Sequence, residues 1–249
     1  MVLLVPVTLL GLAVGSFLNV FIHRVPRGES VVSPGSRCPR CGHAIRNRHN
    51  VPVLGWLLLR GRCFDCGAPI SVRYPLVEAG TGALFGLVTW RLWALDLVAA
   101  LPAYLWFTGA GIALAMIDLD LRRLPDRIVL PSYGVIAVLL TGAAAIRHDW
   151  WPLGRAALGA LLLAGCVLAL TVVRRAGANA GQVKAAGLVG GVLAYLSWPS
   201  LLAGAVVAAV LGVIATIAVR RAAGRTPPYG LFLVGGALVA IVLSRAGSS

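Results

Sequence analysis

The sequence has 249 residues, of which 59% are hydrophobic and only 12% charged, and it contains 30 glycines. This composition excludes both an ordinary soluble enzyme and a disordered tail. The net charge of +14 would indicate nucleic-acid binding in a soluble domain. Here, however, the basic residues stand in short blocks between apolar runs, so we interpret them as membrane-topology signals and expect no nucleic-acid partner.

Apolar segments recur along the whole chain, and most approach the roughly 20 residues that a helix needs to cross a bilayer. They predict an all-α polytopic membrane protein with about eight transmembrane helices. A count of seven stays open, because the sixth segment is short and ends at Trp198-Pro199. The expected spans are 2–22, 76–95, 97–117, 128–146, 155–173, 184–198, 199–219 and 229–244.

The basic residues predict the orientation of these spans, because cytoplasmic loops carry an excess of Lys and Arg. Nine basic residues lie in residues 23–75, and three more lie in each of three later connections on the same side of the membrane. This side therefore holds eighteen of the 22 basic residues. The opposite side holds only Arg91, Arg147, Arg155 and Arg245. We therefore expect both termini outside and three parts: a first transmembrane helix (1–22), a cytoplasmic module (23–75) and a transmembrane domain (76–249).

Two CxxC pairs in the module predict a metal site. Cys38 and Cys41 form one pair, Cys63 and Cys66 the other, with 21 residues between Cys41 and Cys63 and a glycine after each pair. Four thiolates at this spacing are typical of a closed structural zinc site, which would fold a loop with little core of its own. Two disulfides or redox chemistry are the alternatives, but a cytoplasmic loop is kept reduced. Cys166 lies in an apolar segment and receives no role.

Acidic residues are scarce, which makes a carboxylate at membrane depth a candidate for function. The chain has eight, and none follows Asp149. Asp118 lies deepest, at the end of the third predicted span. Asp120 and Asp126, in the segment Leu119-Asp-Leu-Arg-Arg-Leu-Pro-Asp126, are interpreted as partners that offset the neighbouring arginines.

Several motifs in order along the chain resemble the type IV prepilin peptidases. Asp118 followed by Leu124-Pro125-Asp126 is similar to the first catalytic motif of that family. The cysteine pairs resemble its cytoplasmic module. Further matches are Gly15-Ser-Phe-Leu-Asn19, His23-Arg-Val-Pro-Arg27, Tyr74-Pro-Leu-Val-Glu78 and Pro228-Tyr-Gly230.

The resemblance implies an intramembrane aspartic protease of the bacterial inner membrane. Its substrates would be prepilins or pseudopilins of type IV pili and type II secretion, cut at the cytoplasmic face. Many relatives also methylate the new N-terminus, which requires S-adenosylmethionine, but no glycine-rich nucleotide loop of the GxGxxG kind supports that cofactor here.

The family's second catalytic aspartate lies in a Gly-x-Gly-Asp-Val-Lys motif, and this chain has Gln182 at that position, followed by Val183 and Lys184. In aspartic proteolysis two carboxylates share a proton, whereas an amide cannot accept one from water. Asp120 would project to another side of its helix and Asp126 follows Pro125, so neither is a good substitute. Glu78 could approach Asp118, but the resemblance gives it a separate structural or substrate role.

Three explanations of Gln182 stay open: a natural homologue without proteolysis, an engineered inactive form, or an enzyme with a divergent pair of acids. The corresponding functions are a prepilin peptidase, with or without methyltransferase activity, and an inactive membrane protein that binds pilin-like transmembrane segments. Small-residue runs such as Ala185-Ala-Gly187 would allow a pilin helix to approach closely, although ordinary helix packing explains them equally well.

Overall fold

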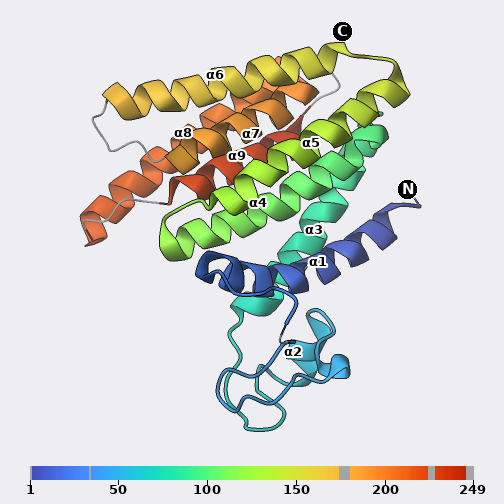
Figure 1. Ribbon diagram of the computed structural model, residues 1–249, viewed down its shortest axis with the longest axis vertical. Coiled ribbons are helices and arrows are strands. Elements are labelled where there is room, and N and C mark those ends of the chain that lie inside the picture. Colours follow the sequence, from blue (N-terminus) through green and yellow to red (C-terminus); the bar gives the residue numbers. More distant parts are fainter. Residues whose placement is uncertain (1, 34, 174–179, 224–227, 245–249) are drawn as a thin grey trace. The chain divides into compact units, whose positions relative to one another are not determined.

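A computed structural model describes residues 2–33, 35–173, 180–223 and 228–244 (Figure 1). Within these ranges the backbone forms α-helices, short 3-10 helices and two isolated β-bridges, without a β-strand. The predicted all-α class is therefore confirmed. Four arginines that were counted for the topology lie outside the described residues: Arg174, Arg175, Arg225 and Arg245. Residues 177–179 of the Gln182 motif also lie outside them.

The chain divides into two compact units at residues 89 and 90, inside a helix. The first unit contains α1 (Leu4–Arg24), η1 (Val25–Arg27), η2 (Asn47–His49), α2 (Leu54–Leu58) and most of α3 (Arg73–Ala94). Glycines let α1 and α3 approach closely. A Cβ atom added to Gly11 would lie 2.8 Å from Cβ of Phe85, and one added to Gly15 would lie 2.7 Å from Cα of Glu78. Such small-residue contacts are typical of helix pairs in membranes.

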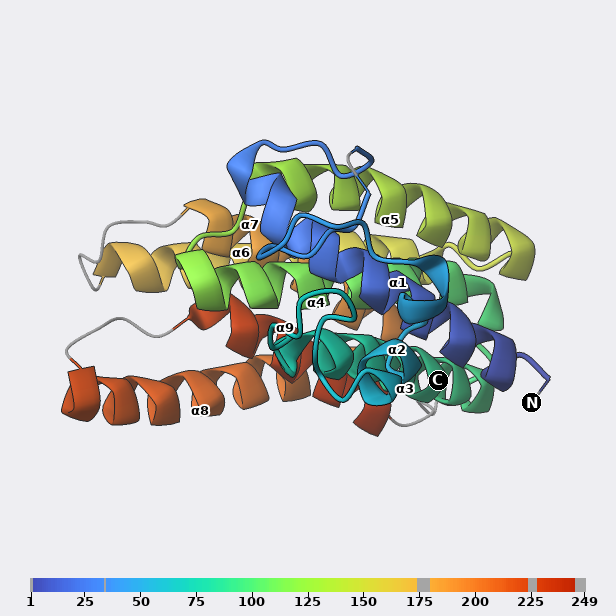
Figure 2. The ribbon, with the colours of Figure 1, turned by 90° about the horizontal axis from the view of Figure 1, so that it is seen from below.

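The second unit is a helical bundle that begins with the last turn of α3 and η3 (Val98–Ala100). Its long helices are α4 (Leu101–Leu121), α5 (Asp126–Arg147), α6 (Trp151–Val173), α7 (Ala180–Leu196), α8 (Trp198–Ala223) and α9 (Tyr229–Leu243). Within this unit α6 forms one edge in Figure 1, and α8 forms one edge in the view turned by 90° in Figure 2.

Helix α7 lies in the centre of the bundle, in contact with α5, α6, α8 and α9. Glycines face α6 at positions 187, 190 and 191, and the two helices approach so closely that a Cβ atom on Gly190 would collide with the backbone of Gly159. The buried Tyr104 of α4 donates a hydrogen bond to the carbonyl of Val192, 2.7 Å away. Small side chains and a few buried hydrogen bonds thus position the helix that begins with the Gln182 motif.

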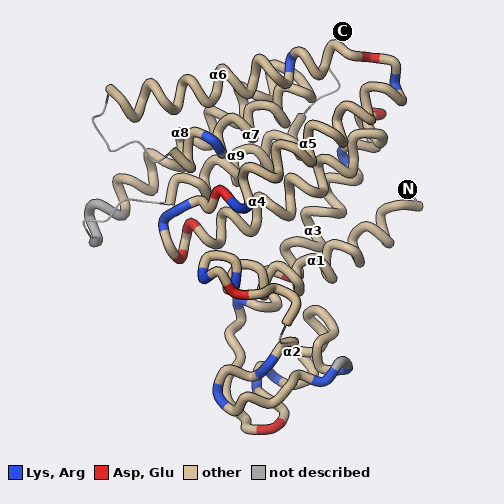
Figure 3. Tube along the Cα trace, viewed as in Figure 1, with Lys and Arg blue, Asp and Glu red and all other residues tan. Residues whose placement is uncertain are grey.

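Helix lengths agree with a protein that crosses the membrane several times. Five helices in the described residues, α1, α4, α5, α6 and α8, are long and apolar enough to span a bilayer, and α7 and α9 are shorter apolar helices. The remaining long helix, α3, has 22 residues and carries Arg73, Glu78 and Arg91. In the second unit, charged residues are concentrated at helix ends, most visibly where α4 turns into α5 (Figure 3).

Candidate active site and metal centre

Asp118 is buried near the C-terminal end of α4, where it caps the start of another helix. Its side chain is 2% exposed, and its Oδ2 atom accepts a hydrogen bond from the backbone N–H of Gly230, 2.7 Å away. Gly230 lies in the first turn of α9, whose first amides have no partner within their own helix. A carboxylate there also interacts favourably with the positive end of the helix dipole.

Gly230 makes this approach possible because it lacks a side chain. A Cβ atom at that position would lie 2.9 Å from Asp118 Oδ2 and 2.9 Å from Leu124 Cδ2. Both contacts are closer than ordinary van der Waals packing. The sequence resemblance identified Pro228-Tyr229-Gly230 as a matching motif, but it did not predict that Asp118 would accept a hydrogen bond from it.

Gln182 lies in the first turn of α7 and is partly exposed. Two residues later, Lys184 Nζ forms an ion pair with Asp126 Oδ2 at 2.8 Å, and Asp126 is the first residue of α5. The backbone carbonyl of Lys184 accepts a hydrogen bond from Tyr133 Oη at 2.6 Å. These contacts hold the start of α7 against the start of α5, the helix that directly follows α4.

The three acids considered as substitutes for a second aspartate have other positions or partners. Asp120 is exposed, whereas Asp118 two residues before it is buried. Asp126 pairs with Lys184. Glu78 belongs to the first unit, is 9% exposed, and accepts a hydrogen bond through Oε2 from the backbone N–H of Val53 at 2.7 Å.

The four cysteines of the CxxC pairs lie together in the first unit. Their Sγ atoms all lie within 4.8 Å of one another, and those of Cys38 and Cys66 are 3.8 Å apart. Four sulfurs at the vertices of a tetrahedron around zinc, each at about 2.3 Å, would be about 3.8 Å apart. The cluster therefore fits a tetrahedral metal ion, and the prediction that these residues could hold one metal is confirmed.

The two halves of this site repeat the same backbone pattern 25 residues apart. Cys38 N–H donates to His43 and Cys63 N–H donates to Ala68, while Gly42 and Gly67 donate back to Cys38 and Cys63. Both glycines have left-handed backbones, with φ of +73° and +70°. This repeated turn, which glycine adopts without strain, directs both sulfurs of each pair to one side.

The thiol of Cys38 is adapted to metal binding by its backbone surroundings. Hydrogen bonds from the backbone amides of Cys41 and Arg40 lower the pKa of Cys38 from 9.0 to about 6, whereas burial and the neighbouring thiols raise the pKa of Cys41 to about 12. At neutral pH the thiolate, which is the form that binds metals, is therefore favoured at Cys38. Beside the cluster, Arg46 pairs with Asp65 at 3.1 Å and stacks over the ring of Phe64, so these exposed contacts join the two halves at the surface.

Known proteins resemble this chain over most of its length. A prepilin leader peptidase/N-methyltransferase of Stutzerimonas stutzeri is 34% identical over 94% of this chain and 88% of its own length. The chain belongs to the prepilin leader peptidase/N-methyltransferase family. A Myxococcus xanthus member is 41% identical over 88% of this chain and 64% of the relative, and one of Pseudomonas aeruginosa is 36% identical over 90% and 85%.

Residues 9–92 of the chain match the family described as bacterial peptidase A24 N-terminal domain. No solved structure matches the chain. The matched segment extends from α1 to α3 and includes the four cysteines. In this member of the prepilin leader peptidase family, the segment is held together by two contacts that sequence reasoning did not predict: Glu78 with Val53, and Asn19 Nδ2 with the carbonyl of Tyr74 at 3.1 Å.

Proposed function

We propose that this chain binds prepilins or pseudopilins at the bacterial inner membrane, and that it does not cut them while residue 182 is glutamine. One observation carries the proposal: Asp118 keeps a buried, hydrogen-bonded position against α9, while the position that the family resemblance assigns to its partner carries an amide. The scaffold of a peptidase is thus retained without the second acid.

The chemistry of peptide hydrolysis explains why one carboxylate is insufficient. One acid must accept a proton from the attacking water while the other donates a proton to the peptide carbonyl. The Gln182 amide can form hydrogen bonds with water or substrate, but it cannot accept the proton. Asp118, oriented by the Gly230 amide, would then bind the substrate without completing the reaction.

The names of the relatives support the substrate class. They are called prepilin leader peptidases, and this chain matches two of the three described above over more than four fifths of their length. The apolar helix of a pilin could lie against the bundle, whose α6 and α8 expose many large hydrophobic side chains. The partners we infer are therefore the lipid bilayer and prepilins of type IV pili or pseudopilins of type II secretion.

The test is cleavage of a prepilin in membranes by four forms of the chain: as given, Asp118→Asn, Gln182→Asp, and the two changes combined. We expect cleavage only from Gln182→Asp, because only that form has both acids. Gln182→Asn is the matched control and should stay inactive. Cleavage by the unchanged chain that Asp118→Asn abolishes would overturn the proposal and identify a divergent pair of acids.

The proposal includes the orientation of the chain in the membrane and the metal of the cysteine module. We infer that residues 23–75 form a cytoplasmic module between a first membrane helix (1–22) and a membrane domain (76–249), with both termini outside. Zinc held by Cys38, Cys41, Cys63 and Cys66 would serve as a structural ion, because four protein ligands leave no position for water.

Methyl transfer is a second candidate, supported by the second half of the relatives' names. It does not require a pair of acids, so Gln182 does not exclude it. S-adenosylmethionine would supply the methyl group. The described residues contain no unit of strand, glycine-rich loop and helix that would fit this cofactor, so we assign it no residues. Transfer of labelled methyl groups to a pilin that already has a free mature N-terminus tests this activity separately.

A further inference from the structure

Helix α2 presents an apolar face that no part of the cysteine module covers. Leu54, Leu57 and Leu58 are 57%, 56% and 77% exposed, and Val51 just before the helix is also exposed. Three exposed leucines within five residues form a patch, whereas scattered single hydrophobic residues on a surface need no explanation. The helix itself is firmly fixed, since Trp56 Nε1 donates to the carbonyl of Ile70 at 3.0 Å and Gly55 packs against the backbone of His49.

The attachment of α2 determines where this face lies within the first unit. Val53, the residue before the helix, donates its N–H to Glu78 Oε2 at 2.7 Å, and Glu78 lies in the second turn of α3. Val53 has a φ of +61°, which is costly for a β-branched residue and persists only where surrounding contacts hold it. The leucines are therefore held beside the point where α3 begins, next to the glycine-mediated contact of Glu78 with α1.

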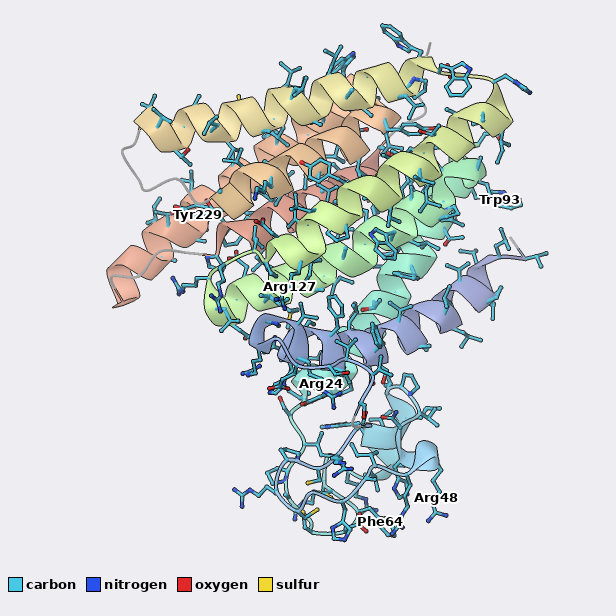
Figure 4. The ribbon with its side chains drawn as sticks, in the orientation of Figure 1. Arg24, Arg48, Phe64, Trp93, Arg127 and Tyr229 are labelled. Atoms are coloured by element: carbon cyan, nitrogen blue, oxygen red, sulfur yellow. The ribbon has the colours of Figure 1, made fainter. Side chains whose placement is uncertain are left out.

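The charge around the patch is strongly basic. Residues 28–72 contain six arginines against two acids, Glu29 and Asp65, and Asp65 is paired with Arg46. Arg48 belongs to η2, which packs against α2, and Arg60 follows α2 directly; both side chains are exposed. Figure 4 shows Arg48 on the side of the module that carries α2.

We propose that α2 and its flanking arginines form a lipid-binding surface that inserts leucines at the acyl boundary and binds anionic headgroups. Apolar residues flanked by Lys or Arg are the typical composition of helices that lie in a membrane interface. The module is joined to α1 and α3 at both ends, and the hydrogen bond between Val53 and Glu78 keeps α2 beside the start of α3. This contact would keep the zinc module against the bilayer from which α3 begins.

The full-length, zinc-loaded chain in lipid nanodiscs tests the proposal. A genetically encoded fluorescent amino acid replaces Val51 in one sample and the exposed Phe64, between Cys63 and Cys66, in the other. Nanodiscs contain phosphatidylcholine with or without phosphatidylglycerol, and brominated acyl chains serve as quenchers. We expect quenching at position 51 but not at position 64, and stronger quenching at position 51 when anionic lipid is present.

Two sets of variants test the apolar part and the basic part of the surface separately. Leu57→Gln with Leu58→Gln should reduce quenching at position 51 to the level of position 64, whereas Ile45→Gln, an exposed apolar residue elsewhere in the module, should not. Arg48→Gln with Arg60→Gln should remove only the increase caused by anionic lipid. Zinc content of one per chain in every variant verifies that the module is folded.

Four results would overturn the proposal. The first is an unquenched probe at position 51 in folded protein, and the second is quenching that the leucine variant leaves unchanged. The third is quenching that disappears in nanodiscs restricted to one chain, and the fourth is protection of position 51 that arises only when a prepilin is added. These last outcomes would identify a second copy or the substrate as the occupant of the leucine face.

Discussion

At the scale of single residues, Gly230 controls how closely Asp118 can approach α9. We expect Gly230→Ala to displace the carboxylate or the helix start, because its new Cβ would lie 2.9 Å from Asp118 Oδ2. Such overpacking typically costs about 1–3 kcal/mol of unfolding free energy. Thermal unfolding in detergent measures this loss, and in the Gln182→Asp background the same change should reduce cleavage.

Gly235 provides the matched control, because it lies in the same helix with nothing within 4 Å of an added Cβ. Gly235→Ala should be neutral or slightly stabilising, since alanine favours a helix by about 1 kcal/mol over glycine. Equal effects of the two substitutions would mean that helix propensity, rather than contact with Asp118, governs position 230.

From the sequence, Arg155 was interpreted only as one of the few basic residues on the side of the membrane opposite the cysteine module. In the structure its guanidinium donates to the carbonyls of Ala194, Tyr195 and Leu196, at 2.5, 2.6 and 2.9 Å. It thereby satisfies the last carbonyls of α7, which have no partner within the helix. Sequence reasoning could not find this contact, because the two partners are about 40 residues apart and nothing in the pattern of either segment specifies the other.

Arg155→Gln should therefore destabilise the bundle by about 2–4 kcal/mol, because it leaves partly buried carbonyls without a charged donor. Arg147→Gln removes a basic residue whose contacts, with the carboxylate and the backbone carbonyl of Asp96, are exposed, so it should cost less than about 1 kcal/mol. Chemical denaturation in detergent, monitored by circular dichroism, distinguishes the two. Similar losses for both variants would show that the carbonyl cap contributes no more than a surface pair.

At the scale of helices, the contact between α6 and α7 depends on glycine. Gly190→Ala should weaken it strongly, because its Cβ would meet the backbone of Gly159 and Cβ of Leu163. A loss of about 1–3 kcal/mol is expected for such a clash between rigid helices. Gly165→Ala, in α6 with open space around it, is the control, and the melting temperatures of the two variants provide the comparison. A stable Gly190→Ala variant would mean that the helices can move apart without cost.

The helices themselves were largely predictable, because apolar length determines a membrane span without knowledge of its neighbours. The first and last residues of the helices were less predictable. The segment predicted at 184–198 is α7, which begins at Ala180 and ends at Leu196, so Gln182 and Lys184 lie inside its first turns. The span was predicted from apolar residues alone, so the polar Gln182 and Lys184 were not recognised as part of the helix. Helix α2 was also missed, since five residues between loops carry no periodicity.

At the scale of the whole molecule, the two compact units predict separable responses to loss of metal. The cysteine module contains only short helices in the described residues, so we expect its fold to depend on a bound metal, whereas the bundle has a core of its own around Tyr104, Phe107 and Leu193. In zinc-finger peptides metal binding contributes about 10–16 kcal/mol, which is effectively their folding free energy. The approach of the two sulfurs within each pair was predictable from the CxxC spacing, since one short-range turn creates it.

A high-affinity chelator should therefore unfold the module and leave the membrane helices intact. We expect one zinc per chain by native mass spectrometry before treatment and none after it. Trypsin should then cut at the module's arginines, while circular dichroism keeps its helical signal. Cys63→Ser should reproduce the treated state, whereas Cys166→Ser, which replaces an exposed cysteine outside the cluster, should retain the metal. A metal-free chain whose module still resists trypsin would contradict the structural role of zinc, because disulfides or the protein core would then suffice to hold that fold.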